Sequence, residues 1–216
     1  NHLTLMRTVH FLAKGGWVMV PIALLSILTV YAFVERAITL YRKRTPQQSW
    51  LDNIYAQILA GDLQGVAMLC EEKNRPVAKV LQVGITSLTQ TPTSLATALE
   101  AAGQHEVHKL EKNLALLGTI ASTAPMLGFL GTVLGMIQAF MAMAQATQAQ
   151  MSPQLLSGGI YEAMITTAAG LIVGIMADLA YKLILVRVQT ATHHIEQASR
   201  RFMELSIQRI PVAIKP

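Results

Sequence analysis

The sequence predicts an all-α membrane protein with three transmembrane helices, the second and third extended as long helices into a cytoplasmic helical domain. Of its 216 residues, 52% are hydrophobic and only 13% are charged. Soluble domains carry about 25% charged residues, and the mean hydropathy of +0.42 also indicates a membrane protein. Three apolar segments are long enough to cross a bilayer, which takes about 20 residues. No strand pattern competes with them.

The predicted elements alternate between the membrane and the two sides of it. They are an outer interfacial helix at 1–16, a first transmembrane helix at 17–39, a cytoplasmic helical region at 40–113, a second transmembrane helix at 114–144, a periplasmic turn at 145–154, a third transmembrane helix at 155–186, and a cytoplasmic C-terminal helix and tail at 187–216.

Within the cytoplasmic region, local signals predict where helices begin. Asp62 is a predicted N-cap, Pro76 suits a first helical turn, and a Thr/Ser cap precedes the helix that starts near residue 93. Before the second span no breaker stronger than Gly103 follows, so this helix is expected to run straight into that span as one helix over 93–144, about 78 Å long. After the third span, one helical face carries the apolar residues Ile195, Ala198, Phe202 and Leu205.

The distribution of basic residues predicts the orientation. Eight of them flank the spans on one side, namely Arg36, Arg42, Lys43, Arg44, Lys109, Lys112, Lys182 and Arg187. Only Arg7 and Lys14 lie on the other side. The positive-inside rule places the eight in the cytoplasm and the N-terminus outside, most simply in a periplasm. The net charge of +5 therefore reflects membrane orientation, and no nucleic-acid partner is expected. The single cysteine, Cys70, allows no intrachain disulfide and fits a reducing cytoplasm.

Two acidic residues, Glu162 and Asp178, interrupt the third span. A charged residue at a helix centre costs about 2.5–3.5 kcal/mol on insertion scales. Either Glu162 lies at the outer interface, or it is a carboxyl group in a proton path. Thr166 shares its helix face, and Thr167 lies one residue further round. These three residues and Thr132, from the second span, form the predicted proton path, although each threonine could equally bond its own helix.

Asp178 is expected to have a different role. Sixteen residues along a helix correspond to about 24 Å and a rotation of about 160°, so Asp178 and Glu162 face nearly opposite ways. Lys182 follows four residues later, which is a favourable spacing for an ion pair at the inner rim. A role in proton exit is the alternative for Asp178.

The spans are also rich in small residues. The pairs Gly131/Gly135 and Gly170/Gly174 have the small-xxx-small spacing that lets membrane helices approach closely. Together with Gly128, they predict close packing of the second and third spans.

The segments "APMLGFLGTVLGMIQAF" and "GGIYEAMITTAAGLIVGIMADLAY" resemble the second- and third-span motifs of the MotA/TolQ/ExbB proton-channel family. The first span, "GGWVMVPIALLSILTVYAFVERAITL", resembles that of ExbB-type members. The resemblance implies an oligomeric ring, typically a pentamer, in the bacterial inner membrane. It also implies an ExbD-type single-span partner inside the ring and a TonB-type protein driven by the proton-motive force. The family's glutamate falls on Glu162 and its pore threonines on Thr132 and Thr167.

The chain departs from the family pattern near the end of the third span. Many relatives have proline where this chain has Met176, an apolar residue at Asp178, and asparagine at Lys182. The last two changes fit a local ion pair between Asp178 and Lys182.

Three other functions are alternatives to an ExbB-like one. The first alternative is a TolQ-like subunit for envelope maintenance, which belongs to the same family. An intramembrane enzyme lacks support because the chain has neither an HExxH nor a GxSxG motif. All six histidines lie outside the spans. His193-His194 and His105/His108 could in principle bind a metal, but they lack companion Cys or acidic ligands at a suitable spacing, so no metal or cofactor is expected. A passive scaffold would explain the glycines but leaves Glu162 unexplained.

Overall fold

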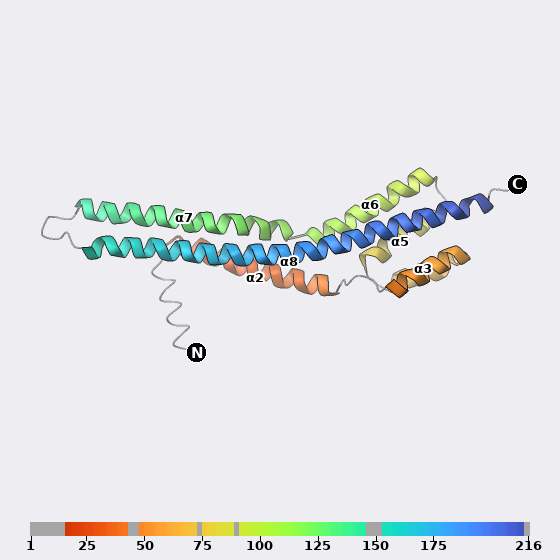
Figure 1. Ribbon diagram of the computed structural model, residues 1–216, viewed down its shortest axis with the longest axis horizontal. Helices are drawn as coiled ribbons and strands as arrows, with labels where there is room; N and C mark the ends of the chain where they lie inside the picture. The colour runs from red at the N-terminus through yellow and green to blue at the C-terminus, as the bar shows by residue number, and fades with distance from the viewer. Residues whose placement is uncertain (1–15, 43–47, 73–74, 89–90, 146–152, 214–216) are drawn as a thin grey trace, which may run out of the picture. The chain divides into compact units, whose positions relative to one another are not determined.

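The computed structural model describes residues 16–42, 48–72, 75–88, 91–145 and 153–213. Over these residues it contains seven α-helices and no strand, which confirms the all-α class. The helices are α2 (Met19–Arg42), α3 (Gln48–Ala60), α4 (Leu63–Glu72), α5 (Pro76–Thr86), α6 (Pro92–Glu111), α7 (Leu114–Gln145) and α8 (Pro153–Ala213) (Figure 1). The predicted interfacial helix at 1–16 lies outside the described residues except for Gly16, as does most of the predicted turn at 145–154.

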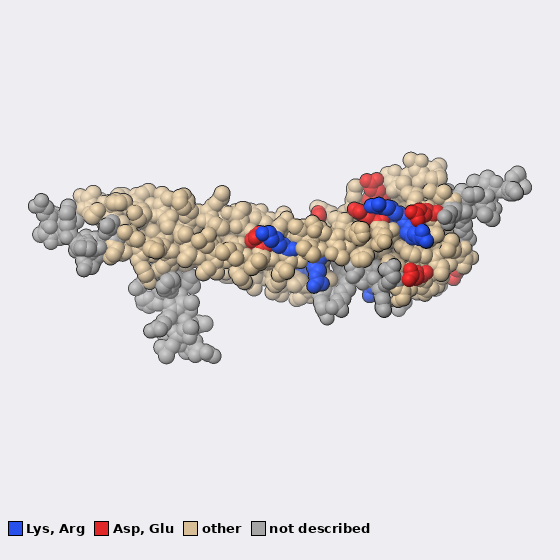
Figure 2. Space-filling view, in the orientation of Figure 1, with Lys and Arg blue, Asp and Glu red and all other residues tan. Residues whose placement is uncertain are grey.

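Three of these helices are long and apolar enough to cross a membrane, which confirms the number of spans. The qualifying segments are Met19–Leu40 of α2, Leu114–Gln145 of α7 and Ser157–Ile207 of α8. On the face shown in Figure 2, charged side chains are few over the first unit and more numerous over the helices of the second unit, which include the C-terminal part of α8.

The chain divides into two compact units. The first consists of Asn1–Glu35 and Asn113–Leu183, and the second of Arg36–Lys112 and Ile184–Pro216. Helix α8, with 61 residues, contributes to both units, as predicted for a third span that continues as a long helix.

In the first unit, α2 packs against both α7 and α8. A cluster of buried side chains joins Val18, Met19 and Ile22 to Ile165, and Leu127 of α7 packs against it. The outward faces of the same helices are strongly apolar yet exposed, as Phe129 of α7 (68% exposed) and Ile172 of α8 (63%) illustrate. Lipid or other apolar helices must cover these faces.

The second unit consists of α3–α6 and the C-terminal part of α8, which contacts α5 at Gly84 and α6 at Gly103. The predicted apolar face of α8 is confirmed, because Ile195, Ala198, Phe202 and Leu205 are all buried. Three predicted helix starts are also confirmed. Asp62 Oδ1 accepts a hydrogen bond of 2.9 Å from Gly65 N, Pro76 opens α5, and Thr91 Oγ1 accepts from Ser94 N at the start of α6.

The prediction of one unbroken helix over 93–144 is wrong. Helix α6 ends at Glu111 and α7 begins at Leu114. Between them Lys112 has an extended ψ of 137° and Asn113 a left-handed φ of 61°. Asparagine tolerates this region better than most residues, and here its side chain is held by Glu35, whose Oε2 accepts from Asn113 Nδ2 at 2.9 Å.

Candidate functional site

Helices α7 and α8 run side by side in the first unit (Figure 1), and glycines line the seam between them. A Cβ atom placed on Gly170 would lie 2.6 Å from the carbonyl oxygen of Ala124 and 2.8 Å from the Cα of Gly128. A Cβ on Gly131 would clash with the Thr166 side chain. The same holds further along the seam, where Gly135 faces Ala163 and Gly174 faces the Pro125 ring. All five glycines selected from the sequence therefore lie at the contact between α7 and α8.

Two threonines of α8 lie at this seam. Thr166 is 1% exposed and donates a hydrogen bond of 2.8 Å to the carbonyl oxygen of Ala163 in its own helix. Thr167 instead reaches across the seam, where its hydroxyl donates to the carbonyl oxygen of Gly128 at 3.0 Å. That contact requires the close backbone approach, because a side chain at Gly128 would meet the Thr167 backbone at 3.1 Å.

The third threonine, Thr132 on α7, bonds its own helix. Its hydroxyl donates to the carbonyl oxygen of Phe129 at 2.6 Å. Thr132 follows Gly131, which contacts Thr166, so it lies at the same level of the helix pair as the other two threonines. Each hydroxyl uses its proton in a hydrogen bond and keeps oxygen lone pairs that can accept another.

Glu162 is partly buried, and its carboxylate is directed at Gly16, just before α2. A Cβ atom on Gly16 would clash with Oε1 of Glu162. Gly16 also has a φ of +66°, a conformation that disfavours any other residue except Asn or Asp. The glycine therefore serves two purposes, since it allows the backbone to turn into α2 and leaves room for the Glu162 carboxylate.

The four residues of the predicted path do not form one hydrogen-bonded group. Five residues separate Glu162 from Thr167, which is a rotation of about 140° on a helix. Thr167 accordingly meets α7, whereas the Glu162 carboxylate meets the residues that begin α2. Thr166 lies between them, with its hydroxyl 3.4 Å from the Glu162 carbonyl oxygen.

Asp178 and Lys182 form an ion pair on an exposed face of α8. The Nζ atom of Lys182 lies 2.7 Å from Oδ2 of Asp178, and the two side chains are 66% and 43% exposed. An ion pair this exposed contributes little in water, about 0–1 kcal/mol. No described contact joins this pair to Glu162.

Sequence reasoning missed the polar contacts at the far end of the first span. Arg36 is 2% exposed, and its Nη1 donates to the carbonyl oxygen of Lys109 at 3.3 Å. The Lys109 ammonium in turn lies 2.6 Å from Oε1 of Glu106, which is also buried. The Glu35–Arg36 pair that ends the first span was the available signal. Gly16 was also missed, although two adjacent glycines precede that span.

The structure describes four of the histidines. The rings of His193 and His194 lie 6.2 Å apart, edge to face. Among the described residues, no group of three or more His, Cys, Asp or Glu side chains is arranged to hold a metal ion.

The profile of the MotA/TolQ/ExbB proton channel family matches residues 72–197, more than half of the chain. This chain belongs to the MotA/TolQ/ExbB proton channel family. The family match includes the α7–α8 seam, its threonines and Glu162. The family is one of membrane proton channels in transport rather than of enzymes.

Individual members of the MotA/TolQ/ExbB family extend the match over most of the chain. A Synechocystis protein named ExbB-like 3, described as a biopolymer transport protein, is 30% identical over 195 residues, which cover 87% of this chain and 93% of the relative. The ExbB biopolymer transport protein of Neisseria meningitidis serogroup A is 30% identical over 76% of this chain and 79% of its own. The Tol-Pal system protein TolQ of Haemophilus influenzae is 39% identical over 50% of this chain and 44% of its own.

Proposed function

We propose that this chain is an ExbB-like subunit of a proton-driven motor in the bacterial inner membrane. Together with an ExbD-type single-span partner, it converts the proton-motive force into mechanical work on a TonB-type protein, which energises uptake across the outer membrane. The long match to proteins named for biopolymer transport supports this role. The partner helix would carry an aspartate, so this chain supplies one part of the proton path.

The observation that carries the proposal is the position of Glu162. Its carboxylate lies within an apolar candidate span, partly buried, in the space that Gly16 leaves free. A carboxyl group within an apolar span is costly, and this one lies at the outer end of the helix pair, beside the residue that precedes the first span. Since Gly16 and the bend before α2 accommodate this side chain, a functional role is a better explanation than chance.

The threonines extend the path along the helix pair. Thr166 is adjacent to Glu162, and Thr167 and Thr132 follow on the side of the seam towards α7. Water or the partner's aspartate would exchange protons along these oxygens, with Glu162 at the outer end.

The energetics set what the subunit must do. A proton that crosses 100 mV releases about 2.3 kcal/mol. When the partner's aspartate is protonated and neutral, it can pass apolar surface. When it is ionised, it is favoured beside polar groups such as Thr132 and Thr167. Alternation between these two states would bias the partner's motion inside the ring, by rotation or as a piston.

The exposed apolar faces support the proposed ring of identical subunits, for which a pentamer is the family expectation. Within one chain, only 22–28% of the most apolar 18-residue stretch of each span is buried. The remainder is available to neighbouring subunits, the partner helix and lipid. The distribution of Lys and Arg supports a periplasmic N-terminus and a cytoplasmic C-terminus.

A TolQ-like role in envelope maintenance is the second candidate. The TolQ proteins of Haemophilus influenzae and Pseudomonas aeruginosa are 39% and 42% identical to this chain, higher than the ExbB-named relatives, but over only 50% and 40% of it. Complementation separates the two roles. An ExbB-like chain restores energised uptake to cells that lack their own ExbB, whereas a TolQ-like chain restores envelope integrity to cells that lack TolQ.

The central test replaces Glu162 with Ala or Gln and measures proton-driven uptake in cells with a normal level of the protein. Uptake is expected to be lost in both variants. Asp178→Asn is the matched control, because it makes the same carboxylate-to-amide change on the same helix in an exposed ion pair. Unimpaired uptake with Glu162→Ala would remove the central role of Glu162.

A second measurement separates a proton channel from a passive scaffold. Proton flux is followed in liposomes that contain this chain with or without its single-span partner. A channel subunit gives flux that depends on the partner and on Glu162. A scaffold gives no flux in either preparation.

A further inference from the structure

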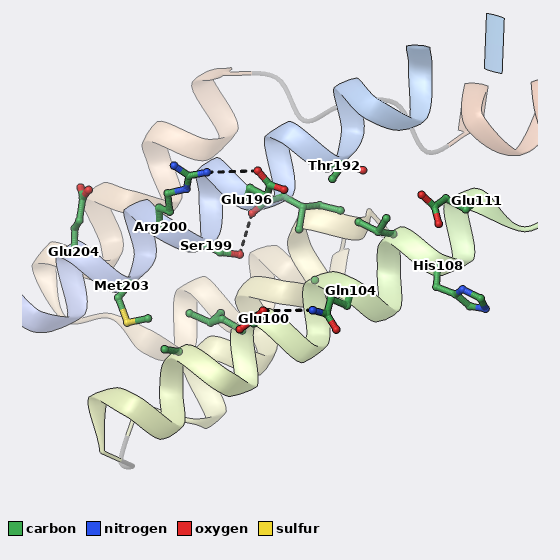
Figure 3. A pocket seen from close by; sticks show the side chains of 15 residues that line it. Glu100, Gln104, His108, Glu111, Thr192, Glu196, Ser199, Arg200, Met203 and Glu204 are labelled. Atoms are coloured by element: carbon green, nitrogen blue, oxygen red, sulfur yellow. Dashed lines mark hydrogen bonds and ion pairs between the residues drawn. The ribbon is translucent and has the colours of Figure 1, made fainter. Parts of the chain in front are cut away.

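In the second unit, α6 and α8 border a groove of about 1080 Å³ that lies outside the proposed proton path (Figure 3). Its floor is apolar and includes Leu99, Gly103 and Val107 from α6, with Ile195 and Met203 from α8. The two helices meet at Gly103, where a Cβ atom would lie 3.4 Å from Cγ2 of Ile195. The floor is therefore continuous between the helices.

The rim of the groove is acidic. Four glutamates line it, Glu100 and Glu111 from α6 and Glu196 and Glu204 from α8, against one arginine, Arg200. With His108 neutral, the lining carries a formal charge of −3, whereas the whole chain carries +5. The lining of the groove is thus negatively charged, although the chain as a whole is positively charged.

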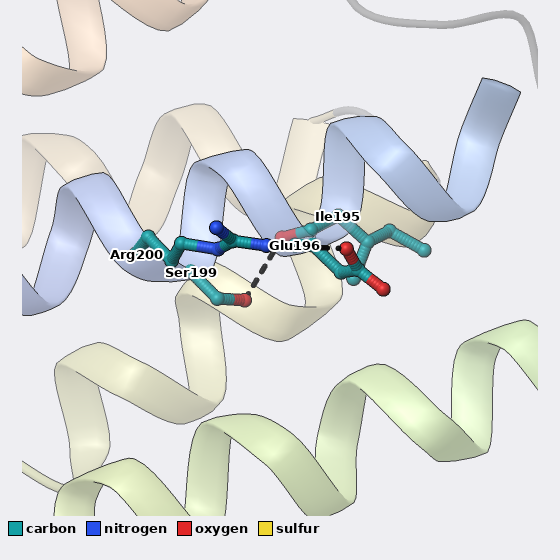
Figure 4. Close-up of polar contacts among 4 residues, drawn as sticks. All are labelled: Ile195, Glu196, Ser199 and Arg200. Atoms are coloured by element: carbon teal, nitrogen blue, oxygen red, sulfur yellow. Dashed lines mark hydrogen bonds and ion pairs between the residues drawn. The ribbon is translucent and has the colours of Figure 1, made fainter.

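Two of the four glutamates are already paired within α8. Arg200 Nη2 lies 3.4 Å from Glu196 Oε2 (Figure 4), and Arg201 Nη1 lies 3.1 Å from Glu204 Oε2. On α6, Glu100 accepts a hydrogen bond of 3.3 Å from the neutral amide of Gln104, and Figure 3 shows this pair beside the space between the helices. Neither Glu100 nor Glu111 has a Lys or Arg partner among the described residues.

We propose that this groove binds a basic amphipathic helix of a partner protein. An apolar floor between two helices receives the apolar face of a third helix, and Lys or Arg side chains at the edges of that face would meet Glu100 and Glu111. The lining on α6 runs from residue 96 to residue 111, about 22 Å, which matches roughly four turns of a bound helix. The same charge disfavours anionic lipid and nucleic acid as occupants.

The proposal is independent of proton flux and is tested by direct binding. The full chain is placed in phosphatidylcholine nanodiscs, which carry no net charge that would attract a basic peptide. The probe is a fluorescein-labelled 18-residue helical peptide of Leu, Ala and Lys, with Leu on one face and Lys at its edges. A second peptide with Glu in place of every Lys is the charge control, and empty nanodiscs measure binding to lipid.

Charge variants are expected to change the affinity for the Lys peptide in both directions. The double variant Glu100→Gln/Glu111→Gln is expected to weaken binding of the Lys peptide about fivefold, since two exposed ion pairs are lost. Arg200→Gln is expected to tighten binding, because it removes the groove's own cation and frees Glu196. Asp52→Asn/Glu71→Gln changes the net charge by the same amount at exposed positions on α3 and α4, and is expected to leave binding unchanged.

Three results would overturn the proposal. The first is equal binding of the Lys and Glu peptides, and the second is equal binding by the Glu100→Gln/Glu111→Gln and Asp52→Asn/Glu71→Gln variants. The third is disulfide cross-linking between copies that carry Gln104→Cys and Ser199→Cys, with no binding of the Lys peptide above the empty nanodiscs. That last result would assign the groove to a second copy of this chain.

Discussion

Replacement of Gly170 by alanine is expected to force α7 and α8 apart. The added Cβ would lie 2.6 Å from the carbonyl oxygen of Ala124 and 2.8 Å from the Cα of Gly128. Ordinary van der Waals contact begins near 3.4 Å, so the Ala124 oxygen must retreat by about 0.8 Å. Both obstacles are backbone atoms of α7, so no side-chain rotation can relieve the clash.

The magnitude follows from two opposing terms. Overpacking of a close interface costs about 1–3 kcal/mol. Alanine recovers up to about 1 kcal/mol over glycine in a helix interior. With the full gain subtracted, the net loss relative to the parent is about 0–2 kcal/mol, and relative to an unhindered glycine-to-alanine change it is about 1–3 kcal/mol. A retreat of this size near Gly128 would also lengthen the 3.0 Å bond from Thr167 beyond hydrogen-bonding range.

The measurement is the free energy of unfolding in mixtures of dodecyl maltoside and SDS, followed by tryptophan fluorescence. Gly158→Ala is the matched control, because it lies on the same helix with no atom within 4 Å of the added Cβ. It should be as stable as the parent or slightly more stable. If Gly170→Ala proves as stable as Gly158→Ala, the close backbone contact at the seam is not real.

Three further predictions concern residues outside the proton path. Burial raises the pKa of the Cys70 thiol to about 11. Alkylation of this thiol by a maleimide should therefore be slow at pH 8, and its rate should rise until about pH 11. A plateau in the rate near pH 9 would contradict the burial. Asn113→Gly keeps the left-handed backbone and loses only the hydrogen bond to Glu35. It should cost less stability than Asn113→Ala, which adds about 1–2 kcal/mol of backbone strain. Equal free energies of unfolding for the two variants would rule out that strain. Thr91→Ala removes the cap of α6 and should cost about 1 kcal/mol in the same unfolding assay, whereas Thr91→Ser should retain it.

Local sequence signals predicted the helix starts well, because each depends on residues within one turn. Asp62, Pro76 and Thr91 act on neighbouring backbone groups. The spacing of Ile195 and Phe202 on one face of α8 likewise required only helical periodicity. By contrast, helix α3 was not identified, although Trp50, Ile54 and Ile58 recur at the four-residue spacing of a buried helix face.

The break before α7 could not be predicted from local sequence. Residues 111–114 contain neither Gly nor Pro, and the contact that holds Asn113 comes from Glu35 in another helix. The carboxylate direction of Glu162 was inaccessible for the same reason, because it depends on Gly16 at the other end of the unit's sequence. The acidic groove also combines charges from two distant segments, which only the folded chain brings together.

The glycine seam places main-chain oxygens, rather than side chains, at the centre of the helix pair. The carbonyl oxygens of Ala121, Ala124 and Gly135 lie within about 3.2 Å of positions that a Cβ on the facing helix would occupy, and that of Gly128 accepts from Thr167. Much of the polarity beside the threonines is therefore peptide polarity, which no side-chain substitution removes. An alanine scan of this region would add atoms where scans normally delete them, and its losses would measure crowding instead of missing chemistry. Backbone amide-to-ester replacement on α7 is the substitution that would test these oxygens directly.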